Sequence, residues 1–242
     1  MNWSEISAGA TDLFWNVAGH IVADLLVILF IALIGYLSRS RIKALIKSLQ
    51  FATRMRKNGI SNFYNSRQEY VTARAERSLG EYMLRCRRRF LYVGVYLAGA
   101  TERDRIDSVL STLLERGCEI ELVLLDPDAP RETIRAVERH LAVPNGTLQQ
   151  LLRHAHDHFC KLRSRLSVAA QNRFAIKLHQ EALSSSAMLL DEGESDGRML
   201  VDKIHQAGRD RSFGIEFVLN GDEKGLAEDF ARSFKRIAEA SH

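Results

Sequence analysis

The sequence predicts an α/β domain, a mixed sheet flanked by helices, preceded by one transmembrane helix. Three observations support this prediction. Residues 13–37 form a nearly unbroken apolar run of about 25 residues, and a bilayer core needs roughly 20. Residues 89–97 and 119–125 are short segments rich in β-branched and large apolar side chains, as in buried strands. Amphipathic patterns of helical period lie between and after these segments.

The apolar run is followed by seven Arg and Lys residues between positions 38 and 57, with no Asp or Glu among them. The positive-inside rule puts this side in the cytoplasm. We therefore expect a single-pass protein of the inner membrane with its N-terminus outside and its basic helix against anionic headgroups. The expected parts are an extracytoplasmic tail (1–12), a transmembrane helix (13–37), a basic juxtamembrane helix (38–57) and a cytoplasmic domain (58–242).

The charge distribution argues against nucleic acid as a partner. The formal net charge is +4, and the first 57 residues hold seven basic and three acidic residues. The other 27 basic and 27 acidic residues cancel, so the domain has no basic excess. The local cluster Arg85–Arg89 is either a solvated helix end or an anion-binding patch. Three widely spaced cysteines, Cys86, Cys118 and Cys160, predict no disulfide framework.

Alternating patterns predict the order of elements in the domain. Gly117 ends one helix and Gly- and Asp-rich turns separate the later strands, which we expect to be mostly antiparallel. The segment Leu125–Pro130 follows a buried strand, where ligands bind in open α/β sheets. The expected elements are helix 66–88, strand 89–97, helix 101–116, strand 119–125, helices 131–141 and 146–170, strands 173–179, 186–190, 198–201 and 212–219, and helix 222–240.

Several short phrases together resemble the phospholipase D-like fold, in a degenerate single-module form found in bacterial proteins, over residues 58–240. They are Asn58-Gly59-Ile60, Phe63-Tyr64, Ser66-Arg67, the Val-Gly-Val centre of strand 91–96, Ile176–His179, Ser184–Asp191 and Gly214–Phe217. In active members of this superfamily a His, a Lys two residues later and an Asp five residues beyond form the motif, with the His as nucleophile on phosphorus. Two modules meet at the active site, so the resemblance implies a homodimer.

The stretch that matches the motif carries serines in place of two of its residues. Ser184 and Ser186 stand at the positions of His and Lys, and Asp191 is kept. A serine without an adjacent base is a poor nucleophile, and losing the lysine removes a charge that would neutralise phosphate. We therefore expect a non-catalytic domain without a cofactor, a membrane-anchored sensor or interaction module. Tyr64, Arg67, Ser184, Ser186 and Asp191 are the residues expected to bind a phosphorylated small molecule or nucleotide; the alternative for the serines is an ordinary turn.

Two alternative functions stay open. Lys177 and His179 are two residues apart on a strand and share a face. With Asp191 they are candidates for a shifted catalytic set in a phosphodiesterase, phospholipase or nuclease. The other alternative is a membrane effector of a bacterial stress or phage-defence system.

A cluster of His154, His156, His158 and Cys160 suggests a metal site at first sight. On a helix, His154 and His158 share one face, whereas His156 and Cys160 share the opposite one. Zinc takes three or four protein ligands. The sequence therefore predicts a polar helix face that carries neutral histidines, and no metal site.

Overall fold

A computed structural model describes residues 27, 46–64, 79–97, 106–203, 213–219 and 225–242. The chain divides into two units, Met1–Arg54 and Met55–His242. In the first unit, residues 46–54 are helical, and this helix ends at residue 57. The second unit contains the sheet and all the sites discussed below.

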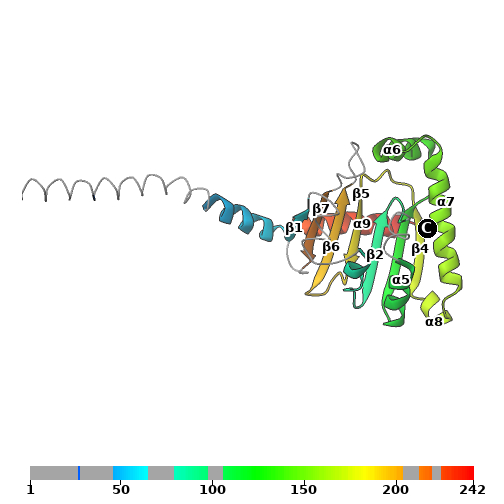
Figure 1. Cartoon of the computed structure of the whole chain (residues 1–242), viewed down its shortest axis with the longest axis horizontal. Coiled ribbons are helices and arrows are strands. Elements are labelled where there is room, and N and C mark those ends of the chain that lie inside the picture. Colours follow the sequence, from blue (N-terminus) through cyan, green and yellow to red (C-terminus); the bar gives the residue numbers. More distant parts are fainter. Residues whose placement is uncertain (1–26, 28–45, 65–78, 98–105, 204–212, 220–224) are drawn as a thin grey trace, which may run out of the picture. The chain divides into compact units, whose positions relative to one another are not determined.

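Seven strands of the described residues form one mixed sheet (Figure 1). In spatial order the strands are β1 (Ile60–Tyr64), β7 (Phe213–Leu219), β6 (Gly197–Lys203), β5 (Ser185–Leu190), β2 (Arg89–Gly94), β3 (Glu119–Leu125) and β4 (Phe174–His179). Neighbouring strands β2, β3 and β4 are parallel, and all other neighbours are antiparallel. The mixed α/β sheet with flanking helices agrees with the sequence prediction.

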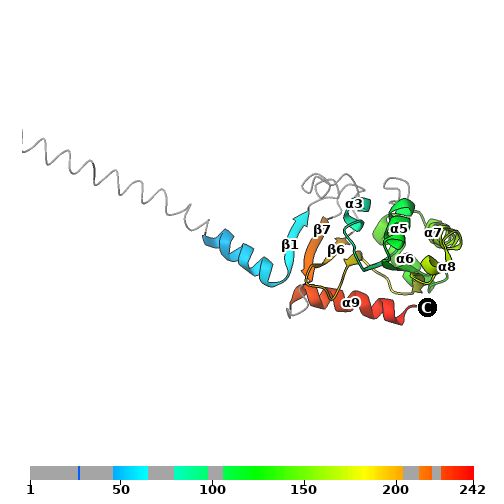
Figure 2. The same cartoon turned by 90° about the horizontal axis from the view of Figure 1, so that it is seen from below.

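Helices cover both faces of the sheet (Figure 2). One face packs against α3 (Leu79–Met83), α5 (Ile106–Glu115) and part of α7 (Thr147–Ser164). The opposite face packs against α9 (Leu226–Ala240). Helix α6 (Arg131–Leu141) joins the N-terminal part of α7 in a third apolar cluster, and the short α8 (Val168–Gln171) leads into β4.

The core has two halves, one on each face of the sheet, and the side chains of the interior strand β2 alternate between them. Phe90 and Tyr92 are buried on the α5 face, whereas Leu91 and Val93 are buried on the α9 face. Because helices cover both faces, the strand is apolar without alternation, as parallel strands usually are. The same pattern made this strand visible in the sequence.

Four elements differ from the sequence prediction. The predicted helix 66–88 ends at Met83, the last residue of α3, and residues 84–88 are not helical. Strand β1 was not expected. The predicted helix 146–170 breaks into α7 and α8, because Ser167 has an extended backbone and its side chain accepts the N–H of Ala170 at the start of α8. Strand β4 is parallel to β3, because three helices connect them and return the chain to the same end of the sheet.

The predicted transmembrane helix and the membrane localisation need correction. Among the described helices, none combines the length and the apolar composition needed to cross a bilayer. The longest of them, α7 with 18 residues, carries charged side chains and buries its apolar side in the domain. The single-pass arrangement thus has no support. Apart from Val27, residues 13–37 lie outside the described residues, as does the tail 1–12.

Candidate functional site

Asp191, the acidic residue of the predicted motif, ties the end of β5 to the start of β2. Its carboxylate accepts the backbone N–H groups of Arg87 (2.9 Å), Arg88 (2.7 Å) and Arg89 (3.1 Å). The Cys86 thiol lies 3.5 Å from the same carboxylate. Asp191 is buried and has a positive φ of 50°. This carboxylate therefore holds backbone in place and does not face a ligand site.

The two serines of the motif lie at the start of β5, at the opposite end of this strand from Asp191. Ser186 pairs with Asp202 on β6, Asp202 pairs with Gly214 on β7, and Gly214 pairs with Tyr64 on β1. Tyr64 and Ser186 thus share one row but are three strand spacings, about 14 Å, apart. The carbonyl of the exposed Ser184 accepts a hydrogen bond from His140 (3.1 Å). Tyr64 donates to Glu216, so these side chains do not converge. Arg67 lies outside the described residues.

The shifted pair is not assembled as a catalytic set. The Lys177 ammonium lies 2.8 Å from Glu121 and also donates to the carbonyl of Ala238. Both ring nitrogens of the buried His179 are used. Its Nδ1 accepts the N–H of Glu181 (3.2 Å), so Nε2 carries the proton and donates to the carbonyl of Gly94 (3.1 Å). Both residues lie near the carboxyl end of β4. Asp191 lies at the other end of the strands, beside the start of β2.

Burial lowers the pKa of His179 below its ordinary value. A second proton on Nδ1 would also point at the Glu181 N–H. The unfolded chain then binds more protons as the pH falls below about 6.5, and the folded state loses stability. Between pH 7.5 and 5.5 this residue is expected to lower the free energy of unfolding by up to about 1.4 kcal/mol.

Urea unfolding of wild type and His179→Gln at both pH values measures this loss. The variant cannot titrate at this position, so its stability should fall less than that of the wild type. Equal losses in the two proteins would contradict the assignment.

In two other regions singled out in the sequence, the rim after β3 and the arginine cluster before β2, polar side chains interact with nearby groups of the domain. At the predicted rim after β3, the buried Asp126 accepts the N–H of Asp128 (2.8 Å) and lies near Gln180 and His242. In the cluster Arg85–Arg89, Arg87, Arg88 and Arg89 form exposed ion pairs with Asp196, Glu194 and Glu121. Three of the four arginines of the cluster are therefore charge-compensated, in the connection between α3 and β2.

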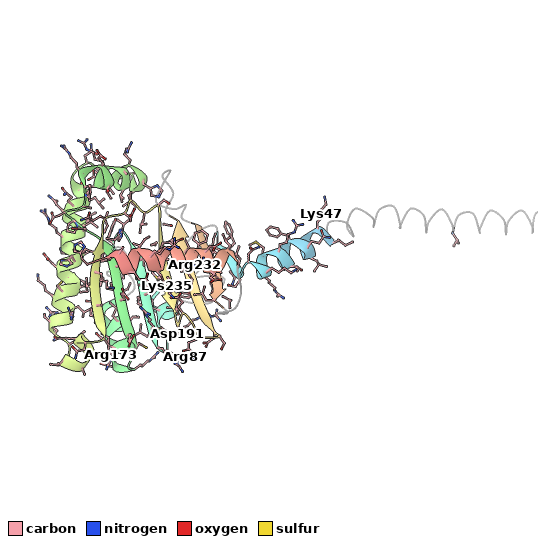
Figure 3. All side chains as sticks on the ribbon, turned by 180° about the vertical axis from the view of Figure 1, so that it is seen from behind. Lys47, Arg87, Arg173, Asp191, Arg232 and Lys235 are labelled. Atoms are coloured by element: carbon pink, nitrogen blue, oxygen red, sulfur yellow. The ribbon has the colours of Figure 1, made fainter. Side chains whose placement is uncertain are left out.

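A cavity of about 260 Å³ lies beside the N-terminal half of α9. Lys57 and the turn between β5 and β6 form its other sides. Its walls combine apolar side chains with cations; Figure 3 labels Arg232 and Lys235 on α9. The lining residues are Lys57, Asn58, Gly59, Glu192, Gly193, Val218, Leu219, Gly225, Ala227, Glu228, Ala231, Arg232 and Lys235.

Close backbone packing fixes one side of this cavity. Gly59 has a φ of +73°, and a Cβ there would lie 2.6 Å from the Cβ of Ala227. The carbonyl of Asn58 accepts the N–H of Ala227 (3.3 Å), in the first turn of α9. The segment before β1 is thus held against the positive end of the helix. Asp191 contributes indirectly, because it anchors the turn that carries Glu192 and Gly193.

The electrostatics of the cavity favour an anion weakly in the free protein. Lys235 pairs with Glu192 (2.7 Å), and Arg232 pairs with Glu228 (2.8 Å). The exposed Lys57 has no ion pair among the described residues. Three cations and two carboxylates therefore line the cavity, and the positive end of α9 adds to the excess.

Residues 72–234 match the family model described as a domain of unknown function (DUF5919). This match covers more than half of the chain. The chain belongs to the DUF5919 family. A comparison with curated proteins gives no match. The matched region includes Glu192 and Arg232 but ends before Lys235 and begins after Lys57. The resemblance to the phospholipase D-like fold and the homodimer stay predictions, since the family description names neither.

Sequence patterns carry only weak signals of this cavity. Arg232 and Lys235 are three residues apart on an amphipathic helix, and such spacing is typical of any solvated helix face. Lys57 was counted with the basic segment before the domain. Glycines at 59, 193 and 225 stand next to cavity walls, but they come from three distant segments. Only the fold brings these residues together.

Proposed function

We propose that this DUF5919 domain is a non-catalytic binding module for a small phosphorylated ligand, held in the cavity beside α9. One observation carries the proposal: three cationic side chains and apolar walls enclose a space of about 260 Å³ at the positive end of a helix. Charge-assisted hydrogen bonds from Lys and Arg are the strong contacts to phosphate.

The apolar walls support an ester of phosphate rather than the free anion. Val218, Leu219 and Ala231 line the cavity together with the cations. Such walls suit the organic part of a ligand, while Lys57 and Arg232 hold the phosphoryl group. The volume is below the usual 300–1,000 Å³ of drug-sized sites, so we infer a ligand no larger than a mononucleotide or a sugar phosphate.

The composition of the lining supports binding without turnover. Among the described residues around the cavity, none is a Ser, Thr, Cys or His. The hydroxyl, thiol and imidazole groups that most often attack phosphorus are therefore absent from this wall. The two carboxylates of the lining, Glu192 and Glu228, are engaged in ion pairs with cations of the same wall. Lys177 and His179, the candidates for catalysis, lie on β4 and are engaged with other groups.

Calorimetric titration of the full chain with adenosine monophosphate tests the proposal, with inorganic phosphate as a second probe. We expect binding that weakens between 50 and 200 mM salt, because the contacts are ionic. Lys57→Ala and Arg232→Ala should each weaken binding by about tenfold through loss of a charged donor.

Arg236→Ala is the matched control, because Arg236 is an exposed cation of the same helix that does not line the cavity. Its affinity should equal that of the wild type. The absence of binding for both probes, or equal affinities for all three variants, would refute the proposal. Release of phosphate from adenosine monophosphate would refute its non-catalytic part.

A further inference from the structure

His156 and Cys160 converge on the surface of α7, one helical turn apart. The Sγ of Cys160 lies 3.6 Å from the Nε2 of His156. Cys160 is exposed, and the His156 side chain is 34% exposed. This is the pair that shared a helix face in the sequence, and the structure brings its two ligand-type atoms together.

The separation of these atoms matches a metal site. Zn–N bonds are about 2.0–2.1 Å and Zn–S bonds about 2.3 Å, so at a tetrahedral angle the nitrogen and sulfur lie about 3.6 Å apart. The distance between Nε2 and Sγ therefore fits a zinc ion bound to both atoms. Imidazole and thiolate are both ligands that zinc prefers.

A carboxylate lies beside the other ring nitrogen of His156. The Oδ1 of Asp157 is 3.8 Å from its Nδ1. A hydrogen bond from this nitrogen to a carboxylate orients many metal-binding histidines, but 3.8 Å is too long for such a bond, so Asp157 does not fix the tautomer of His156 here. Zinc binds the thiolate form of cysteine, so binding releases the thiol proton of each Cys160.

The neighbouring histidines do not complete this site. His158 is 2.9 Å from Asp107, on the side of α7 that faces α5. The described residues contain no group of three or more His, Cys, Asp or Glu side chains placed to hold a metal. Two ligands are thus available in one chain, and a structural zinc site takes four.

We propose that His156 and Cys160 form half of a zinc site that is completed by the same pair of a second copy of the chain. A two-fold axis is the commonest symmetry of homo-oligomers and turns one pair into a Cys₂His₂ set. Two thiolates and two neutral imidazoles balance the charge of Zn²⁺. The exposed position of Cys160 on α7 leaves the pair accessible to another molecule.

Sedimentation of the full, metal-free chain with and without Zn²⁺ tests this proposal. We expect a dimer to form at half an equivalent of Zn²⁺ per chain. Co²⁺ in place of Zn²⁺ should give the visible bands of tetrahedral coordination and a thiolate charge-transfer band. Bound Zn²⁺ should also slow alkylation of Cys160, whereas Cys86 and Cys118 are buried and react slowly in either case.

Cys160→Ser and His156→Ala should weaken zinc binding by about tenfold or more and abolish the zinc-dependent dimer. His154→Ala is the control, because His154 is exposed on the same helix but is not part of the pair. Unchanged sedimentation with Zn²⁺ overturns the proposal. So does one Zn²⁺ per monomer, or a zinc-dependent dimer that persists in both variants. The test is independent of phosphate binding.

Discussion

Replacing Asp191 with alanine is expected to lower the free energy of unfolding by about 4 kcal/mol, one of the two largest effects of a single substitution that we predict. The carboxylate accepts three successive backbone N–H groups, from Arg87 to Arg89. Removing it leaves these donors without their acceptor at the point where β2 begins. Hydrogen bonds to charged groups contribute about 1.5–3 kcal/mol each, although such contributions are not additive. Chemical denaturation of the full chain measures the loss.

Two further variants separate the causes of this loss. Asp191→Gly removes the same carboxylate but accommodates the φ of +50°, so it should be more stable than Asp191→Ala by about 1 kcal/mol. Asp196→Ala removes an exposed acidic partner of Arg87 in the same turn and should change stability by less than about 0.5 kcal/mol. If Asp191→Ala costs no more than Asp196→Ala, the anchoring role is wrong.

The parts of the fold that could be predicted from the sequence are those whose physics is local. The bounds of α6 agree with the prediction, because Pro130 precedes its first turn and Ala142, with a left-handed backbone, follows its last. Strand β3 also agrees, since a strand buried on both faces needs a continuous apolar run. Strand β1 could not be seen in this way. It is a short edge strand that alternates half-buried and exposed residues.

The structure does not bring the residues of the predicted motif together, because nearly the whole length of a strand separates them. Ser184 and Asp191 are seven residues apart, which along an extended strand is about 24 Å. They consequently lie at opposite ends of β5. Asp191 accepts hydrogen bonds from backbone N–H groups, and Ser184 lies near His140. The cavity beside α9 depends on long-range contacts such as that of Gly59 with Ala227. No pattern within either segment reports such a contact.

An ion pair between the partly exposed Arg198 on β6 and the buried Glu216 on β7 carries the second large prediction. Glu216 has a relative exposure of 0% and lies 3.1 Å from the Nη1 of Arg198. Its carboxylate also accepts from the Tyr64 hydroxyl (3.2 Å) and the Asn62 amide (3.3 Å). A charge in this position costs several kcal/mol of desolvation, which its partners must offset.

Arg198→Met is therefore expected to lower the free energy of unfolding by about 3 kcal/mol, because a fully buried carboxylate loses a cation. Glu216→Gln removes the charge itself and should cost less, since the amide oxygen still accepts from Tyr64. The double variant should be more stable than Arg198→Met alone, which gives a favourable coupling energy of at least about 1 kcal/mol in a double-mutant cycle. Additive losses would show that Arg198 acts by packing its aliphatic stem and not by compensating the charge of Glu216.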